Sequence, residues 1–349
     1  MAERGMFGKV LLAGAAAAGA AAWAIAPRSF SDKRDNYVPS IPDVWYAHRG
    51  LHDAGSGLTA QYAAESGEYV ALARRMAMKA GYGTPECVGP IAPENSLAAF
   101  AAACEAGYGI ELDIQLTMDG QVVVAHDETL MRVAGDPRRI CDLTYDELTR
   151  IPLYPTPSHP GCELAEPVPN AVEAPGLVVT PAKPPLGYYQ HVPLFSDVLK
   201  VVAGRVPLIV EYKIDGSDWT PRCEELMEKG DALLQAYAGP YVVESFHPMA
   251  MRWYREHRPE VCRGQLIEPL PLGQTDVTYW AAGRLLFNWL SRPDFVACDW
   301  RSGGSPQVRL NRALGAVPVS WTVRSRDEVA ECDAWFDHHI FESFVPDEH

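Results

Sequence analysis

The sequence of 349 residues predicts an α/β protein folded as a (β/α)8 barrel. From Val44 to the C-terminus, short apolar segments rich in β-branched residues alternate with helical stretches, as expected of parallel strands that are covered on both faces. About eight such units occur, and eight units close a barrel. An open doubly wound sheet is the alternative, although no GxGxxG or Walker-type loop follows the first strand.

The expected strands are the apolar segments Val44–His48, Gly109–Leu116, Gln121–Ala125, Pro207–Tyr212, Tyr241–Ser245, Arg263–Ile267, Phe295–Cys298 and Pro318–Val323, with a further run at His339–Phe344. Helices are expected between them, for example Phe195–Val202 and Asp276–Leu290. Residues 53–90, with a helical segment near Glu65–Lys79, and the proline-rich residues 152–193 interrupt the alternation. We interpret both as insertions at the barrel rim, either passive loops or a lid that selects substrate.

Composition excludes two broad classes. With 48% hydrophobic residues, the chain has ample apolar surface for a folded core and is not a disordered protein. Its 30 Lys and Arg against 45 Asp and Glu give a net charge of −15, which argues against a general nucleic-acid-binding protein. Any phosphate chemistry must therefore use a local positive pocket.

The N-terminal segment differs from the rest. After a short tail (1–9), residues 10–26 carry no charge and would extend about 25 Å as a helix, slightly less than a bilayer core. We predict a transmembrane anchor there, with a cleaved secretion signal as the alternative, then a linker (27–43) and the barrel (44–349). The protein would be a single-pass membrane protein, or secreted if the segment is cleaved; flanking charges leave the membrane side open.

Polar residues concentrate where the expected strands end. Because the carboxyl ends of barrel strands meet at one mouth, these residues should form a single site. They are His48, Arg49, Glu111, Asp113, His126, Glu211 and Lys213.

Three of these residues suit a metal ion. Glu111 and Asp113 point to the same side of one strand, where they repel each other unless a cation lies between them. Glu211 is the natural third member, and three carboxylates without a nearby cysteine suit Mg²⁺ or Ca²⁺. With such an ion, Arg49 and Lys213 leave a small positive excess that matches a singly charged phosphodiester.

His48 and His126 complete the predicted site. Imidazole has an unperturbed pKa of about 6.5, so one histidine is able to accept a proton while another donates one. A lone histidine at a strand end is usually a packing residue. Two that flank a carboxylate cluster favour an acid/base pair.

These segments resemble the glycerophosphodiester phosphodiesterase family, in particular a membrane-anchored bacterial type. The resemblance covers nearly all of Val44–Phe344 and rests on the segments Tyr46-Ala47-His48-Arg49-Gly50, Pro93-Glu94-Asn95-Ser96, Glu111-Leu112-Asp113, Asp119 to Asp127, Glu211-Tyr212-Lys213, Ser245-Phe246 and Ser320-Trp321-Thr322. One departure is His339-Ile340-Phe341-Glu342-Ser343 at the chain end, which replaces the family's Ile-Thr-Asp-Pro type.

The resemblance implies a TIM barrel, a divalent metal ion, and cleavage of glycerophosphodiesters to sn-glycerol 3-phosphate and an alcohol. It implies metal ligation by Glu111, Asp113 and Glu211. His48 and His126 would be the acid/base pair in an in-line attack by the substrate's 2-hydroxyl. The implied substrate contacts are Arg49, Lys213, Glu94, Asn95 and Trp321, with Glu94 and Asn95 in a supportive role and Trp321 as an apolar wall for glycerol.

Two other functions remain open at this level. A phospholipase D-like lyase of the same fold would act on lysolipids or sphingolipids and release a cyclic phosphate. A catalytically silent, membrane-tethered barrel would only bind. The expected partners are a small glycerophosphodiester and, through the N-terminal helix, a membrane.

Overall fold

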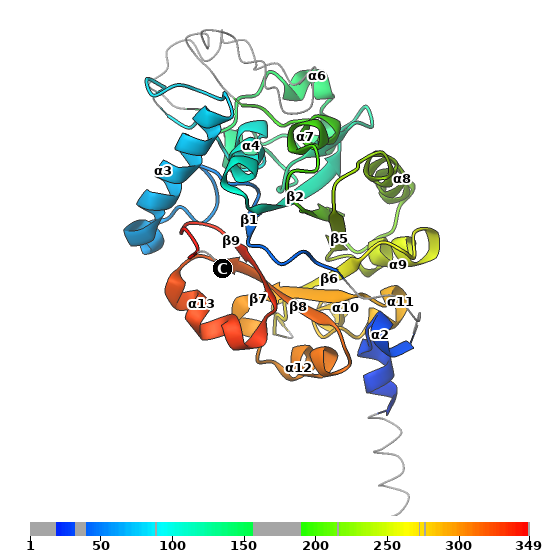
Figure 1. Ribbon diagram of the computed structural model, residues 1–349. Coiled ribbons are helices and arrows are strands. Elements are labelled where there is room, and N and C mark those ends of the chain that lie inside the picture. The colour runs from blue at the N-terminus through cyan, green and yellow to red at the C-terminus, as the bar shows by residue number, and fades with distance from the viewer. Residues whose placement is uncertain are drawn as a thin grey trace, which may run out of the picture.

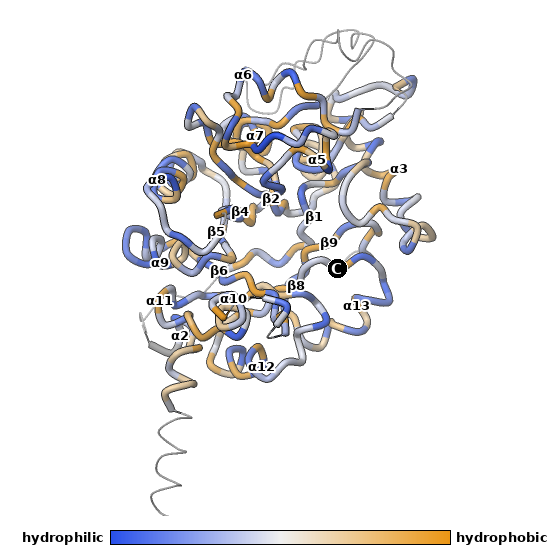
Figure 2. The backbone as a smooth tube through the Cα atoms, turned by 180° about the vertical axis from the view of Figure 1, so that it is seen from behind, coloured by the Kyte–Doolittle hydropathy of each residue, from blue (hydrophilic) through white to orange (hydrophobic). Residues whose placement is uncertain are grey.

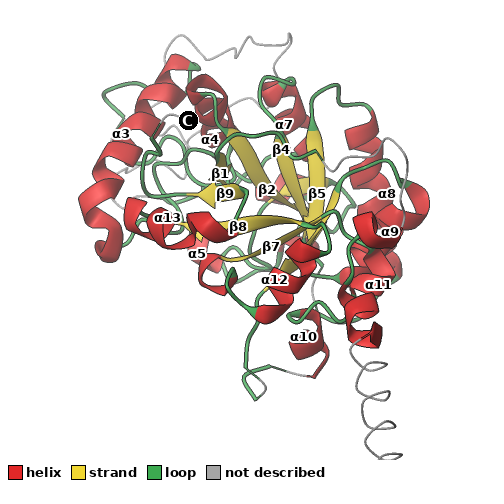
Figure 3. Ribbon diagram, turned by 60° about the horizontal axis from the view of Figure 1, so that its bottom comes forward, coloured by secondary structure: helices red, strands yellow, loops and turns green. Residues whose placement is uncertain are grey.

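The computed structural model describes residues 19–31, 40–87, 89–155, 190–214, 216–271, 273–275 and 277–347. Its centre is a closed barrel of eight parallel strands, because β1 pairs with both β2 and β9. The strands in barrel order are β1 (Tyr46–His48), β2 (Gly109–Leu116), β4 (Leu208–Tyr212), β5 (Tyr241–Ser245), β6 (Arg263–Ile267), β7 (Phe295–Asp299), β8 (Val317–Val323) and β9 (His338–Phe341). Helices surround this barrel (Figures 1 and 3). The predicted barrel is confirmed.

One expected barrel strand lies elsewhere. β3 (Val122–Val124) pairs antiparallel with the end of β2 and is not one of the eight parallel strands. The run at the chain end, β9, closes the barrel in its place. β2 continues past the mouth, turns at Gly120, and β3 returns toward it, so that Ala125 N donates to Asp113 O at 2.9 Å. His126 therefore reaches the mouth on a returning hairpin and not at the end of a barrel strand.

Most helices follow the strands along the chain, as expected. They are α3 (Ala63–Lys79), α4 (Leu97–Ala106), α5 (Met131–Ala134), α6 (Tyr145–Leu148), α7 (Phe195–Val202), α8 (Pro221–Gln235), α9 (Pro248–His257), α10 (Val277–Ala282), α11 (Asn288–Ser291), α12 (Pro306–Ala313) and α13 (Arg326–Cys332). In Figure 2, orange runs along β6 and β8, whereas much of α9 is blue.

Two expected segments differ in detail. Asp276–Leu290 does not form one continuous helix. The helical conformation is interrupted between α10 and α11, where Leu285 adopts a positive φ of 63°. Residues 53–90 hold α3, which packs on α4 outside the barrel (Figure 1). Of the proline-rich residues 152–193, positions 156–189 lie outside the described residues.

Period-2 alternation along the strands creates two cores. Outward residues such as Leu112 and Val210 pack against the helices. Inward residues form a separate cluster at the lower end of the barrel, which includes Tyr46, Ile209 and Val242. The next inward position along each strand is then available for the polar residues at the mouth.

The N-terminal segment meets the barrel at α11. Residues 10–18 of the expected membrane segment lie outside the described part, and residues 19–25 are helical. Among the described residues, no helix has the length and apolar character needed to cross a bilayer. α2 (Arg28–Ser31) follows, and Arg28, in the expected linker, is buried and paired with Asp294 at 2.9 Å. Asn288 Nδ2 and Arg292 Nη1 donate to the carbonyls of Ile25 (3.2 Å) and Ala26 (2.9 Å).

Candidate active site

The polar layer at the mouth follows directly from strand register. β1 places His48 opposite Glu111 of β2, and β4 places Glu211 between Asp113 of β2 and Glu244 of β5. Each of these residues lies one or two inward positions above the apolar layer of the barrel. The resulting cavity has a volume of about 390 Å³. It is lined by His48, Arg49, Glu111, His126, Glu211, Lys213, Glu244, Phe246, Leu266, Glu268, Trp321, Thr322, Arg324 and Ile340.

The predicted carboxylate cluster is present. Glu111, Asp113 and Glu211 are all buried, and one oxygen of each lies within 4.8 Å of the others. Burial and the neighbouring carboxylates raise the pKa of Glu111 well above its usual value. Burial, with Asp113 nearby, raises the pKa of Glu211 to about 7, although Lys213 opposes this rise. A divalent cation would remove this repulsion, and an all-oxygen donor set fits a hard ion.

A fourth buried carboxylate, Glu244, supports that fit. It is 1% exposed, and its Oε2 has no hydrogen-bond partner among the described residues. Burial, with Glu211 nearby, raises its pKa well above the usual range. Sequence reasoning missed Glu244, although it lies two positions after Val242 on the inward face of β5, directly before the quoted Ser245-Phe246. The alternation of inward and outward residues along β5 was the signal that could have identified Glu244.

Lys213 supplies positive charge inside the cluster. Its Nζ lies 3.0 Å from Asp113 Oδ1 and 2.7 Å from Glu211 Oε2. Burial alone would lower the pKa of Lys213, but these two carboxylates outweigh it and raise the pKa. The same ion pair holds the pKa of Asp113 well below its usual value, although burial opposes this. Lys213 is therefore a cation at neutral pH.

Arg49 is held in a strained turn at the end of β1. Its φ is +57°, a conformation that side-chain-bearing residues rarely adopt, and its backbone N donates to Glu111 Oε2 at 3.1 Å. Its guanidinium lies 2.8 Å from Glu94 Oε1 and 3.6 Å from Asp113 Oδ2. The turn thus fixes Arg49 beside the carboxylate cluster.

Glu94 and Asn95 lie behind the cavity and do not line it. Glu94 is 2% exposed and pairs with Arg49 and with Arg132, whose Nη2 is 2.6 Å from Glu94 Oε1. Asn95 Nδ2 donates to Asp113 Oδ2 at 2.9 Å. Glu94 therefore reaches the cavity only through Arg49, and Asn95 contacts the carboxylate cluster through Asp113, which differs from the predicted direct substrate contact.

The two predicted histidines both face the cavity, and each has a carboxylate on its Nδ1. His48 Nδ1 lies 2.8 Å from Glu342 Oε2, and its Nε2 lies 4.0 Å from Glu111 Oε2. His126 Nδ1 lies 2.6 Å from Asp127 Oδ1. Burial lowers the pKa of His48 to about 4, against the opposing effect of Glu342, and also lowers the pKa of His126.

Glu342 is the second residue that sequence reasoning missed. It is fully buried and also accepts from Ser56 Oγ at 2.9 Å and Arg324 Nε at 2.6 Å. It directly follows the apolar residues Ile340 and Phe341 of β9, which is the same signal that identified Glu211 after the apolar run Pro207–Val210. The sequence alone showed it only as a departure from the family pattern.

Trp321 of β8 lines the cavity as predicted for an apolar wall. Its ring packs edge-on against Phe246, with centroids 5.8 Å apart. Phe246 in turn lies with its ring centroid 6.0 Å from Lys213 Nζ. This aromatic pair forms the side of the cavity along β5 and β8.

A buried carboxylate cluster beside two cations and two imidazoles, at the carboxyl ends of barrel strands, defines a class of hydrolase that acts on phosphate esters. A sequence model described as the glycerophosphoryl diester phosphodiesterase family matches residues 87–341. The chain belongs to this family, and the prediction of a phosphodiesterase is confirmed.

Individual relatives agree with this assignment. Glycerophosphodiester phosphodiesterase 1 of Bos taurus is 23% identical over 283 residues, covering 73% of this chain and 74% of the relative. A glycerophosphodiester phosphodiesterase of Caldanaerobacter subterraneus is 48% identical over 60 residues, which are 17% of this chain and 25% of that relative. A phosphodiesterase from Oleispira antarctica, solved with its product sn-glycerol-3-phosphate, shares the fold with a TM-score of 0.52. It is 18% identical and covers 71% of this chain and 87% of that chain.

Proposed function

We propose that this enzyme hydrolyses glycerophosphodiesters to sn-glycerol 3-phosphate and an alcohol, using one Mg²⁺ or Ca²⁺ ion. The observation that carries the proposal is the placement of Glu111, Asp113 and Glu211 within 4.8 Å of one another, in a cavity that both His48 and His126 line. In this proposal the three carboxylates hold the ion. When bound, the ion polarises a phosphoryl oxygen and favours ionisation of an attacking hydroxyl.

The side chains around the cluster have complementary roles. Lys213 and Arg49 attract and orient the phosphate, Lys213 as a point charge and Arg49 through its fork of donors. Glu94 holds Arg49, and Asn95 holds Asp113, so both act as positioning residues. Trp321 covers the apolar face of the glycerol.

We base the proposed roles of the two histidines on their difference in exposure. His48 lies deep beside Glu111 and removes the proton from the glycerol 2-hydroxyl, whose oxygen attacks phosphorus in line. His126, whose side chain is 35% exposed, lies where a departing alcohol reaches solvent, and it protonates that alcohol. Water then opens the cyclic phosphate.

The test uses the purified full-length chain with glycerophosphocholine. We expect release of glycerol 3-phosphate that EDTA abolishes and that Mg²⁺ or Ca²⁺ restores; the ion that restores it identifies the metal. Absence of metal-dependent release from glycerophosphocholine and from other head groups would refute the proposed function.

The proposed ligands are tested separately by Asp113→Asn. This change deletes one charged ligand and should weaken metal binding at least about tenfold, as a titration of the metal-free protein by calorimetry would measure. Asp136→Asn, which removes a partly exposed carboxylate paired with Arg138, is the matched control. If the two variants bind metal equally well, the ion binds elsewhere.

We also propose that residues 10–26 attach the enzyme to a membrane, on the basis of their uncharged, apolar sequence. A variant with two lysines in this segment should move from the membrane fraction to the supernatant. Equal distribution of both proteins would refute the attachment.

A further inference from the structure

Glu244 is a buried carboxylate in the catalytic cavity to which the proposed function gives no role. It is 1% exposed, it lines the cavity, and its Oε2 has no hydrogen-bond partner among the described residues. Lys213, which follows the neighbouring strand β4, pairs with Asp113 and Glu211 instead. Because a buried polar group without a partner is costly, an unpaired carboxylate that lines a substrate cavity indicates a missing cation or a donor on the substrate.

The arrangement of the carboxylates favours a donor on the substrate. Glu111, Asp113 and Glu211 are the one group of three acidic residues in the described part of the chain whose oxygens lie within 4.8 Å of one another. Glu244 adds negative charge beside this group but lies outside it. The ion needs no fourth carboxylate, since water and substrate oxygens complete the coordination of Mg²⁺ and Ca²⁺.

Glu244 belongs to the same wall of the cavity as the aromatic pair. Phe246 lies two positions further along the chain and also lines the cavity, as expected of the next inward position after Glu244. The Phe246 ring packs edge-on against Trp321, with centroids 5.8 Å apart. A carboxylate beside an aromatic face suits a polyol, because the rings cover the C–H groups and the carboxylate accepts from a hydroxyl.

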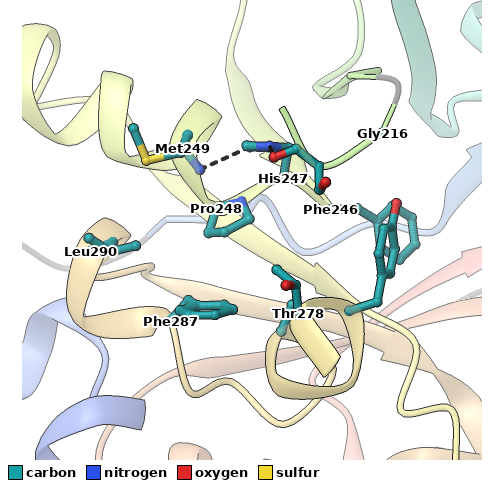
Figure 4. Close-up of a pocket in the computed structure, with 11 residues that line it drawn as sticks. Gly216, Phe246, His247, Pro248, Met249, Thr278, Phe287 and Leu290 are labelled. Atoms are coloured by element: carbon teal, nitrogen blue, oxygen red, sulfur yellow. Dashed lines mark hydrogen bonds between the residues drawn. The ribbon is translucent and has the colours of Figure 1, made fainter. Parts of the chain in front are cut away.

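The apolar cavity next to this wall offers Glu244 no cation. Phe246 also lines this second cavity, which has a volume of about 180 Å³ and lies between the start of α9, the helix α10 and the helix α11 (Figure 4). No Lys or Arg is among its lining residues. The donor that Glu244 lacks has therefore to enter the catalytic cavity itself.

The proposed reaction leaves one hydroxyl of the glycerol without a partner. The 2-hydroxyl gives its proton to His48, and the phosphate oxygens meet the ion and the two cations. The departing alcohol lies at His126, on the β3 hairpin beside β2, so the glycerol extends toward β5 and β8, where Glu244 and Trp321 line the cavity. The 1-hydroxyl is the donor that remains for Glu244.

We propose that Glu244 accepts a hydrogen bond from the 1-hydroxyl of the glycerol and so selects substrates in which this hydroxyl is free. The inference rests on the proposed function for the position of the glycerol. A substituent on the 1-oxygen removes the donor and leaves the carboxylate buried without a partner, and sites built to bind a hydroxyl reject such analogues. Glu244 is thus a specificity-determining residue.

The experiment compares glycerophosphocholine with 2-hydroxypropyl phosphocholine of the same configuration, which lacks the 1-hydroxyl but keeps the 2-hydroxyl that attacks phosphorus. For the unaltered enzyme, kcat/KM should be about 10- to 100-fold higher with glycerophosphocholine, as expected of a hydrogen bond to a charged acceptor. Each variant is measured at a saturating metal concentration, so that a change in metal affinity does not enter the comparison. Equal kcat/KM for the two substrates would overturn the proposal.

Glu244→Met keeps the length of the side chain and removes both oxygens. It should reduce the preference to less than about threefold, mainly through a lower kcat/KM for glycerophosphocholine, whereas Glu244→Gln, which keeps one acceptor oxygen, should retain part of the preference. Glu268→Met removes an exposed carboxylate from the lining of the same cavity and should keep the full preference, so it is the matched control. If Glu244→Met slows both substrates equally, the carboxylate does not act on the 1-hydroxyl and the proposal is overturned.

Thermal unfolding separates this role from a structural one. Because Oε2 of Glu244 has no partner among the described residues, both variants should keep or raise the melting temperature of the protein without metal or substrate, as measured by circular dichroism. Lower melting temperatures in both would mean that the carboxylate stabilises the fold, which would overturn the proposal. If only Glu244→Met is destabilised, the substrate comparison is made with Glu244→Gln.

Binding of the product separates this proposal from the proposed function. In calorimetry on the metal-saturated protein, sn-glycerol 3-phosphate should bind at least about tenfold more tightly than 2-hydroxypropyl phosphate to the unaltered chain, and about equally to Glu244→Met. Such a preference without any cleavage of glycerophosphocholine would refute the proposed function and retain the role of Glu244. Cleavage of both choline esters with equal kcat/KM would do the reverse.

Discussion

The two histidines of the site occupy contrasting surroundings. His48 has a side chain that is 12% exposed, and its partner Glu342 is fully buried. His126 is 35% exposed and its partner Asp127 is 27% exposed. The hydrogen-bond arrangement is nevertheless the same in both pairs. In each, the carboxylate contacts Nδ1 of the imidazole, so that Nε2 is available for other contacts. One pair is built into the barrel, and the other lies on a surface hairpin.

The difference indicates how one barrel provides a base and an acid. Glu342 fixes His48 in a rigid place, since Ser56 Oγ, Arg324 Nε and His52 Nε2 also contact its carboxylate. Asp127 is held by Arg132 on a half-exposed surface, where solvent reaches the imidazole and the departing alcohol. A buried carboxylate–histidine pair should contribute more to catalysis than an exposed pair, because solvent screens the second.

The largest expected effect comes from the histidines themselves. His48→Ala and His126→Ala should each lower kcat by about 10²–10⁴ without unfolding the protein, as measured by steady-state kinetics and circular dichroism. A glycerophosphodiester with a p-nitrophenol leaving group should restore activity to His126→Ala, because this leaving group needs no acid. His48→Ala should not recover. Recovery of both variants, or of His48→Ala alone, would contradict the assignment of base and acid.

A smaller effect is expected from the partners of the histidines. Glu342→Gln should lower kcat by about 10- to 100-fold with little change in KM, because it removes the charge that orients and stabilises His48. Asp127→Asn should cost less than about tenfold, since its charge is partly screened. Metal affinity, measured by calorimetry, should remain unchanged in both variants. Equal losses of kcat would show that burial does not distinguish the two pairs.

The same contrast shows how much of the site the sequence could predict. Alternation along β2 and β4 predicted the inward carboxylates, because Glu111 and Asp113 alternate with apolar residues within β2 and Glu211 follows the apolar run of β4, and both patterns are local. Glu342 is 294 positions from His48, and its role depends on β9 closing the barrel against β1. The pairing of β9 with β1 arises only when the sheet closes, so no single segment of the sequence could predict it.

His126 was predicted in the right place for the wrong reason. The run Gln121–Ala125 has the composition of a buried strand, so it was counted as part of the barrel. Composition does not distinguish a parallel barrel strand from a short antiparallel one, and only the pairing with β2 decides this. The break between α10 and α11 was missed although Gly283 directly follows α10, because a single glycine within a helical pattern does not by itself end a helix.

The last prediction concerns stability and not activity, and it comes from Glu94, which connects the two regions. It pairs with Arg49 on the side of His48 and with Arg132, which also holds Asp127 at 2.7 Å. Burial alone would raise the pKa of Glu94, but the two arginines outweigh it and lower the pKa to about 2. A carboxyl group with a lowered pKa stabilises the fold above its unfolded value of about 4.3, and this contribution disappears as the pH falls toward 2.

Glu94→Gln should therefore lower the free energy of unfolding by about 3 kcal/mol at pH 7, and the difference from the unaltered protein should shrink between pH 4.5 and pH 2. Denaturant unfolding followed by circular dichroism at several pH values measures both effects. Glu105→Gln, which removes a surface carboxylate paired with Lys79 and Arg205, should cost less than about 1 kcal/mol. A difference for Glu94→Gln that stays constant with pH would mean that its shape, and not its charge, joins the two histidine regions.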